Sequence, residues 1–212
     1  MAVSCLKEDM FSIQGYQDFA TAYQGKLVTD NGLSLTIVKN ESGNENWKNE
    51  GERFLILCDI LNRNLETTLK GVQDVDIVHP VPYTESEDEP DDPVDVFNHS
   101  ISGGYINMVL EYYTNPTSNT AHVLSFYYET NAAKDEFTFH VLHEGNDENP
   151  AFMDEKKLEK VSEVVSVPIW DLLKRSTPTK LNLCLYQLKK AQDGTYSIEQ
   201  NTYPLHTGSV VL

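Results

Sequence analysis

The sequence predicts an all-β protein in which a small barrel is followed by a β-sandwich. Three observations predict this fold class. Glycine, proline and tyrosine are frequent, with 11, 9 and 11 copies in 212 residues. Short apolar runs alternate with polar residues, which is the period of half-buried strands. Sustained helical periodicity is nearly absent, so a chain of this length is expected to bury its core between strands.

The first predicted domain is an OB-like barrel at residues 19–83. The stretch Asp30-Asn31-Gly32 supplies turn chemistry between two alternating segments, which predicts a hairpin. About sixty residues of short strands suit an OB-type barrel. Its strands are predicted at 20–28, 33–37, 53–61 and 66–78.

Residues 84–95 form an acidic, proline-containing segment that we predict to be the linker between two domains. Its carboxylates repel one another, and its prolines cannot donate to a strand ladder. A cation site is the alternative, because hard cations bind carboxylate oxygens, but the spacing lacks the pattern of a formed calcium loop. A solvated linker is therefore expected.

The second predicted domain is a β-sandwich at residues 96–212. Seven strands over about 115 residues fit this architecture. Residues 131–135 suit a hairpin loop, and Pro168–Arg175 is the one stretch that predicts a short helix, with proline tolerated at its start. Strands are predicted at 105–113, 122–129, 137–143, 161–169 and 180–188, with short pieces near 196 and 210.

The N-terminus resembles an export and lipidation signal. Ala2-Val3-Ser4-Cys5 resembles the end of a bacterial lipoprotein signal, in which the cysteine thiol is acylated. Lys7, Glu8 and Asp9 resemble the export signal that sends Bacteroidetes lipoproteins to the outer face of the outer membrane. We therefore expect residues 1–18 to be a tether, Cys5 to be lipidated in the full-length precursor, and the protein to face the cell exterior. The alternative is that Cys5 is incidental in a frayed N-terminus.

Cysteine count and charge exclude several classes. Three cysteines are too few for a disulfide scaffold, and Cys58 and Cys184 lie in strand-like runs that predict buried thiols. The formal net charge of −17 repels polyphosphate and anionic headgroups. Nucleic acid is therefore not an expected partner, and contact with a membrane is expected only through a lipid anchor.

Three stretches resemble the NigD-like family of Bacteroidetes lipoproteins. They are Asn49–Leu57, Ser102–Met108 after the acidic segment, and Val164–Leu173. The resemblance covers nearly the whole chain from Cys5. It implies an OB-like N-terminal domain, an immunoglobulin-like C-terminal sandwich and export to the cell envelope. It implies no established activity, although a role in immunity to a bacteriocin has been suggested for the family, and no functional residue is carried over from it.

The histidines allow one cross-strand pair. If residues 131–135 close a regular hairpin, His122 faces His143, and an ordinary surface pair is the expected role. A metal site would need further ligands, such as Glu129 or Glu144, that the sequence does not place. The same register makes these pairs: Tyr128 with Phe137, Phe126 with Phe139, and Leu124 with Val141.

Aromatic residues are dense over three predicted sandwich strands. On alternating positions some must point outward, where exposed rings could form a glycan or peptide groove. The other interpretation is that they fill the core and brace its outer face. The residues are Tyr105, Tyr112, Tyr113, Phe126, Tyr127, Tyr128, Phe137 and Phe139.

No nucleophile elbow, zinc-binding helix, phosphate loop or paired-cysteine motif is present. We therefore predict no catalytic residue, cofactor or metal. The leading hypothesis is a non-enzymatic lipoprotein that binds an unknown protein or glycan at the cell surface. The alternatives are a protective protein that intercepts a bacteriocin and an enzyme of unrecognised type.

Overall fold

The structure is a computed structural model that describes residues 11–84, 90–175 and 178–205. The chain divides into two compact units, the first ending at Val75 and the second beginning at Asp76. Both units are built from strands, which confirms the predicted all-β class. Among the described residues, no helix is long and apolar enough to cross a membrane.

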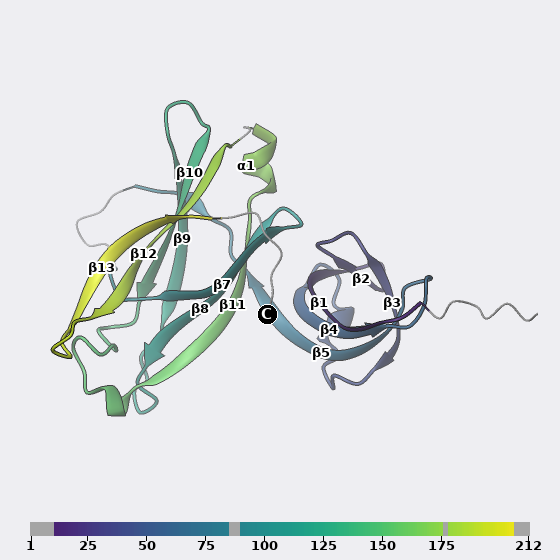
Figure 1. Cartoon of the computed structure of the whole chain (residues 1–212), viewed down its shortest axis with the longest axis horizontal. Helices are drawn as coiled ribbons and strands as arrows, with labels where there is room; N and C mark the ends of the chain where they lie inside the picture. The colour runs from purple at the N-terminus through teal and green to yellow at the C-terminus, as the bar shows by residue number, and fades with distance from the viewer. Residues whose placement is uncertain (1–10, 85–89, 176–177, 206–212) are drawn as a thin grey trace, which may run out of the picture. The chain divides into compact units, whose positions relative to one another are not determined.

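The first unit is a small barrel (Figure 1). Strand β1 pairs with β2 and β4, and the parallel pairing of β3 with β5 closes the ring. Its assignment to the OB class stays a prediction. The elements are β1 (Ile13–Tyr23), β2 (Lys26–Thr29), β3 (Ser34–Asn40), the 3-10 helix η1 (Asn46–Lys48), β4 (Arg53–Ile60) and β5 (Glu66–Ile77).

The barrel core consists of alternating residues of these strands, as their sequence period predicts. Strand β4 shows the pattern most clearly, because every second residue from Phe54 to Ile60 is buried. The core residues are Ala20, Ala22, Leu27, Leu35, Trp47, Phe54, Ile56, Cys58, Ile60 and Leu69.

The predicted strand at 20–28 is wrong in one respect. It is interrupted by a tight turn at Gln24-Gly25, so its two halves belong to β1 and β2, which pair with each other. Both turn residues have positive φ, 51° and 73° respectively, which matches a two-residue hairpin turn. The alternating pattern continues across the turn because a two-residue loop preserves the inward and outward order of the side chains.

The second unit is a sandwich of two sheets, visible as two layers in Figure 1. One layer has the order β5-β11-β8-β7, where only the end of β5 takes part, and the other has the order β13-β12-β10-β9-β6. The elements are β6 (Val81–Pro82), β7 (Asp95–Ser102), β8 (Tyr105–Thr114), β9 (Val123–Thr130), β10 (Glu136–Glu144), the 3-10 helix η2 (Glu155–Lys157), β11 (Glu159–Pro168), α1 (Trp170–Arg175), β12 (Lys180–Lys190) and β13 (Tyr196–Pro204).

Inward-facing side chains of both layers form the sandwich core. Strands β8 and β11 contribute Ile106, Met108, Leu110, Val165 and Val167, and the facing layer contributes Phe126, Phe137, Phe139, Val141, Leu183 and Leu185. The sandwich prediction is confirmed, and so is the short helix. However, Pro168 still pairs with Tyr105 as the last residue of β11, and the helix begins at Trp170.

Two strands, β6 and β7, were missing from the prediction. Strand β7 begins at Asp95, and Asp92 and Val94, which we assigned to the linker, are buried in the second unit at 9% and 1% exposure. β7 is an edge strand with polar and exposed residues, so its alternation is weak, and its strand conformation comes from pairing with β8. The short strand expected near 210 lies outside the described residues.

Candidate binding pocket

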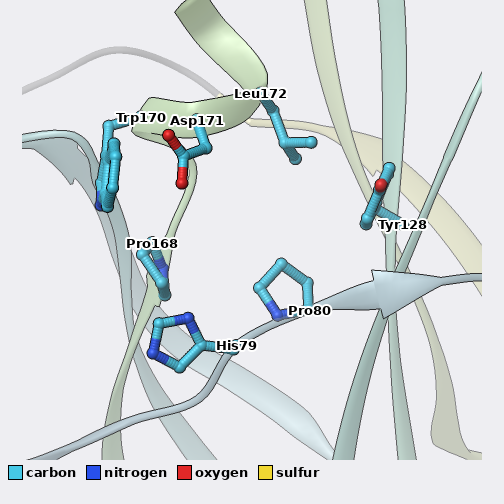
Figure 2. A pocket seen from close by; sticks show the side chains of 7 residues that line it. All are labelled: His79, Pro80, Tyr128, Pro168, Trp170, Asp171 and Leu172. Carbon is cyan, nitrogen blue, oxygen red and sulfur yellow. The ribbon is translucent and has the colours of Figure 1, made fainter.

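A pocket of about 190 Å³ opens on the second unit (Figure 2). Three parts of the chain that are distant in sequence line it: the stretch between β5 and β6, strand β9, and the end of β11 together with helix α1. In Figure 2, Trp170 and Pro168 lie across the opening from Tyr128. The lining residues are His79, Pro80, Tyr128, Pro168, Trp170, Asp171 and Leu172.

The end of β11 fixes the position of Trp170. Ile169 is fully buried, and its backbone N–H donates to the Gly104 carbonyl at 2.9 Å. The next residue, Trp170, therefore begins helix α1 at the surface, where its side chain remains 42% exposed. The Lys174 ammonium lies 4.3 Å from the centre of its ring, a cation–π contact that orients the indole.

Gly104 allows the indole to pack closely on the β7–β8 turn. A Cβ atom built on Gly104 would lie 3.1 Å from the Cβ of Trp170, and the glycine has φ +83°. Both the space and the backbone conformation therefore require glycine here. This turn belongs to the Ser102–Met108 stretch that the sequence analysis singled out.

The pocket combines flat apolar surfaces with a few polar groups. The rings of Trp170 and Tyr128 and two prolines supply the apolar part, and the His79 imidazole and Asp171 carboxylate supply the polar part. Sites for complete small molecules occupy roughly 300–1,000 Å³. A pocket of about 190 Å³ therefore suits one sugar ring or one amino-acid side chain of a larger partner.

The predicted aromatic groove is only partly present. Phe126, Phe137 and Phe139 are buried in the core, so for them the structural interpretation is correct. Of the eight predicted rings, Tyr128 alone lines the pocket. Trp170 was not among the candidates, although its place two residues beyond the end of a strand, where the chain leaves the sheet, is one that favours an exposed side chain.

The predicted His122–His143 contact exists, but the register is different. Phe139, not Phe137, lies opposite Tyr128, and His143 lies opposite Leu124. The hairpin closes one residue further along the chain, with Lys134 at positive φ in its loop. The two imidazoles nevertheless meet, since His122 Nδ1 lies 3.0 Å from His143 Nε2.

The histidine pair is buried, which corrects the expectation of a surface pair: the side chain of His122 is 8% exposed and His143 is 2% exposed. The further metal ligands considered do not join it. Glu129 contacts His140 instead, at 3.2 Å, and Glu144 follows His143 on the strand and is exposed. Within the described ranges, no group of three or more His, Cys, Asp or Glu side chains is arranged to hold a metal ion.

The remaining sequence-predicted residues divide into two groups. Cys5, Lys7, Glu8 and Asp9 lie outside the described residues. Cys58 and Cys184 are buried, as predicted. Burial, and then the nearby Asp59 and Asp18 carboxylates, raise the pKa of the Cys58 thiol to about 12, so it is not a nucleophile at neutral pH.

Comparison with known families gives one match. The sequence profile of the NigD-like C-terminal beta sandwich domain matches residues 79–200, which is more than half of the chain and includes every residue that lines the pocket. No curated protein matches the sequence.

Solved structures share the fold over nearly the whole chain. A NigD-like immunity protein from Bacteroides caccae is 17% identical, with a TM-score of 0.60 over 92% of this chain and 99% of that one. A protein of unknown function, DUF1344, from Bacteroides vulgatus is 14% identical, with a TM-score of 0.63 over 92% of both chains. A proposed lipoprotein from Bacteroides fragilis is 11% identical, with a TM-score of 0.58 over 94% of this chain and 100% of that one. At these identities the likeness shows the fold alone.

Proposed function

Because the chain belongs to the NigD-like family, we propose that it is a non-enzymatic lipoprotein of the cell envelope that binds a protein or glycan through the pocket at Trp170. The exposed indole is the observation that carries this proposal. A large ring that is 42% exposed leaves an apolar face available for a partner, and tryptophan is among the residues that most often dominate binding energy. Its neighbours Asp171 and His79 supply hydrogen-bonding groups at the rim.

A binding role also agrees with the state of the reactive groups. The Cys58 thiol is buried with a raised pKa, and His143 and Glu148 are 2% and 7% exposed. General acid–base or nucleophilic catalysis needs such groups within reach of a substrate. The groups that do line the pocket, His79 and Asp171, serve better as hydrogen-bond partners for a sugar hydroxyl or a peptide group.

We place the protein on the outer membrane, with the lipid on Cys5 as its anchor and the folded part facing the exterior. The support is the sequence Ala2–Cys5, the charged triplet Lys7-Glu8-Asp9, and the similarity in fold to a proposed lipoprotein from Bacteroides fragilis. A tether of this kind lets the folded units bind a partner without a membrane-binding surface of their own.

The binding proposal is tested on glycan arrays and peptide libraries with the purified protein. Trp170→Ala should abolish the binding seen with the unchanged protein, because the indole supplies the largest apolar face of the pocket. Phe97→Ala is the matched control, since Phe97 is a 68% exposed aromatic residue of the same unit that does not line the pocket. Equal loss in both variants, or no binder together with activity in a hydrolase panel, would refute the proposal.

The location is tested by protease shaving of intact cells that express the full gene. The protein should be digested in wild-type cells and protected when Lys7, Glu8 and Asp9 are all replaced by alanine. Protection of both would show that the triplet is not an export signal.

A second candidate is interception of a bacteriocin at the cell surface. Two observations favour it: the name of the solved Bacteroides caccae protein, an immunity protein, and the net charge of −17, which attracts cationic polypeptides. Deleting the gene should increase sensitivity to the toxin, and unchanged sensitivity would remove this candidate.

A further inference from the structure

Three side chains of the second unit form a continuous hydrogen-bonded chain. His143 of β10 contacts the Pro93 carbonyl through Nδ1 at 3.3 Å. Its other nitrogen, Nε2, contacts Nδ1 of His122 at 3.0 Å. The remaining nitrogen of His122, Nε2, contacts Oε2 of Glu148 at 3.1 Å. Both rings and the carboxylate are buried.

The geometry requires a close approach of backbone to these rings. A Cβ atom built on Gly145 would lie 2.8 Å from Cε1 of His143 and 2.9 Å from Nδ1 of His122. Glycine at this position therefore makes room for the pair. The hydrogen-bonded chain of side chains therefore depends on the backbone path of the fold and is not an incidental contact between surface side chains.

Both ends of the chain are acceptors. A backbone carbonyl only accepts, so His143 Nδ1 must carry a hydrogen, and neutral His143 then accepts through Nε2. His122 Nδ1 must therefore donate to it. A neutral His122 that donates through Nδ1 has a bare Nε2, which would face the carboxylate of Glu148, another acceptor.

The number of hydrogens that the three hydrogen bonds need decides the protonation state of the two histidines. Three hydrogen bonds need three hydrogens, whereas two neutral imidazoles and a carboxylate supply two. We propose that His122, His143 and Glu148 form a binding site for one additional proton, held as an imidazolium at His122 paired with the Glu148 carboxylate. We call this site the clamp, because it holds the 115–120 segment and the 145–149 loop against the sheet in a pH-dependent way.

The surroundings of Glu148 support the position of the proton. Burial acts to raise the pKa of Glu148, but hydrogen bonds from the Ser118 hydroxyl, the Asn115 backbone N–H, His122 and the Thr120 hydroxyl outweigh it and lower the pKa to about 2. The carboxylate is therefore ionised. Its bond to the Asn115 N–H is 2.6 Å long.

The surroundings of His143 support the neutral form of the second ring. Burial lowers the pKa of His143, and the neighbouring His122 acts in the same direction, whereas Asp92 and the Pro93 carbonyl oppose them. Of the two rings, the one next to the carboxylate holds the additional proton. A buried charge beside its counter-ion costs far less than a charge without one.

Two other titratable side chains lie beside the pair, Tyr112 and Asp92. The Tyr112 ring of β8 stacks on His122, with centroids 5.4 Å apart, and contacts His143 at a tilt of 46°, with centroids 4.6 Å apart. Burial, and then its hydrogen bond to Glu163 of β11, raise the pKa of Tyr112 to about 12, so it stays neutral. The carboxylate of Asp92 accepts from the Gly145 N–H at 2.7 Å and from the Asn149 amide at 3.0 Å.

The clamp joins two loops to the sheet. Glu148 binds the 115–120 segment through Asn115, Ser118 and Thr120, and it contacts His122, the residue immediately before β9. Loss of the additional proton leaves two acceptors facing each other, so one hydrogen bond of the chain must break. The structure therefore ties the position of the 145–149 loop to proton binding.

The test is NMR of the full chain with ¹⁵N-labelled histidine at pH 7, with the six histidines assigned by single substitutions to glutamine. Both ring nitrogens of His122 should be protonated, and only Nδ1 of His143. A neutral His122 would overturn the proposal. Glu148→Gln keeps the size of the side chain and removes the charge, so His122 should then lose one proton at pH 7.

The control for this variant is Glu129→Gln, which removes a carboxylate beside a different histidine, His140, and should leave His122 unchanged. An imidazolium at His122 that persists in Glu148→Gln would also contradict the proposal. The measurement on the unchanged protein stands by itself if the variant fails to fold.

Discussion

The buried ion pair in the barrel makes a quantitative prediction possible. Arg53 of β4 donates to both carboxylate oxygens of Asp30, at 2.9 and 2.6 Å, and the two side chains are 0% and 4% exposed. A third contact runs from Arg53 to the Thr21 hydroxyl at 3.3 Å, and the guanidinium lies 5.4 Å from the centre of the Phe19 ring. The charge of Arg53 therefore has no route to water without opening the barrel.

The perturbation is Asp30→Asn, which keeps the shape of the side chain and removes its charge. Breaking a buried pair by removing one partner costs about 3–5 kcal/mol, because the other charge stays buried. An exposed pair is worth about 0–1 kcal/mol. Lys48 and Glu45, 60% and 63% exposed, form such a pair in the same unit as Arg53 and Asp30, so Glu45→Gln is the control.

The assay is guanidinium denaturation followed by tryptophan fluorescence. The chain contains two tryptophans, and Trp47 lies in the barrel core. In a Trp170→Phe background, the fluorescence therefore reports the first unit alone. A unit of 75 residues is stable by roughly 4–11 kcal/mol, so Asp30→Asn should remove about a quarter of that stability or more.

The double variant Asp30→Ala with Arg53→Met separates the pair from the penalty for breaking it. Replacing both partners by apolar groups is often close to neutral, so the double variant should recover most of the loss. A cost for Asp30→Asn below about 1 kcal/mol, equal to that of Glu45→Gln, would contradict this expectation. It would mean that water reaches Arg53 in the folded barrel.

Three further predictions concern the second unit. Gly104→Ala places a methyl group 3.1 Å from the Cβ of Trp170, on a residue with φ +83°. It should lower the free energy of unfolding of this unit by about 1–3 kcal/mol and shift the fluorescence of Trp170. Unchanged stability would show that the turn can relax. Gly145→Ala should lower the free energy of unfolding, measured with denaturant, by about 1–3 kcal/mol, because its methyl group would lie 2.8 Å from Cε1 of His143. An unchanged free energy of unfolding would mean that the two imidazole rings move apart freely. Stability should fall in two steps on acidification. A lowered pKa in the folded state means that the unfolded state takes up more protons as the pH falls. The contribution of His143 to stability is therefore present above its unfolded pKa of about 6.5 and is lost below it. The contribution of Glu148 to stability is lost as the pH falls from 4.5 towards 2. Thermal melts between pH 6.5 and pH 2, below the range in which the proposed imidazolium of His122 loses its proton, check this order, and Glu148→Gln should reduce the second step.

Part of the candidate site could be predicted from residue patterns. The hairpin at 131–135 implied that His122 and His143 meet, and they do, because strand pairing brings two positions on the same face together even when the register moves. The assignment as a surface pair failed, since burial depends on what covers the strand. Here Tyr112 of β8 and the 145–149 loop cover the rings.

The pocket could not be predicted in the same way. Its walls come from segments between 79 and 172 whose distances in space depend on how the two sheets stack. The sequence predicted a short helix at Pro168–Arg175, but the packing of the Trp170 side chain on Gly104 depends on the hydrogen bond of Ile169 to that turn. The ion pair of Arg53 with Asp30 joins residues 23 positions apart, and no local period reveals it.

Residue patterns alone were sufficient to predict the all-β class, most strands of the sandwich and the two buried cysteines, because alternation and turn residues are local signals that act on near neighbours. The family was predicted separately, from the resemblance of three stretches of sequence. The tertiary structure decided the edge strand β7, the depth of the histidine pair and the pocket around Trp170. Those features depend on which segments pack against each other, and that choice is made by burial of apolar surface over the whole unit and not by any short stretch of chain.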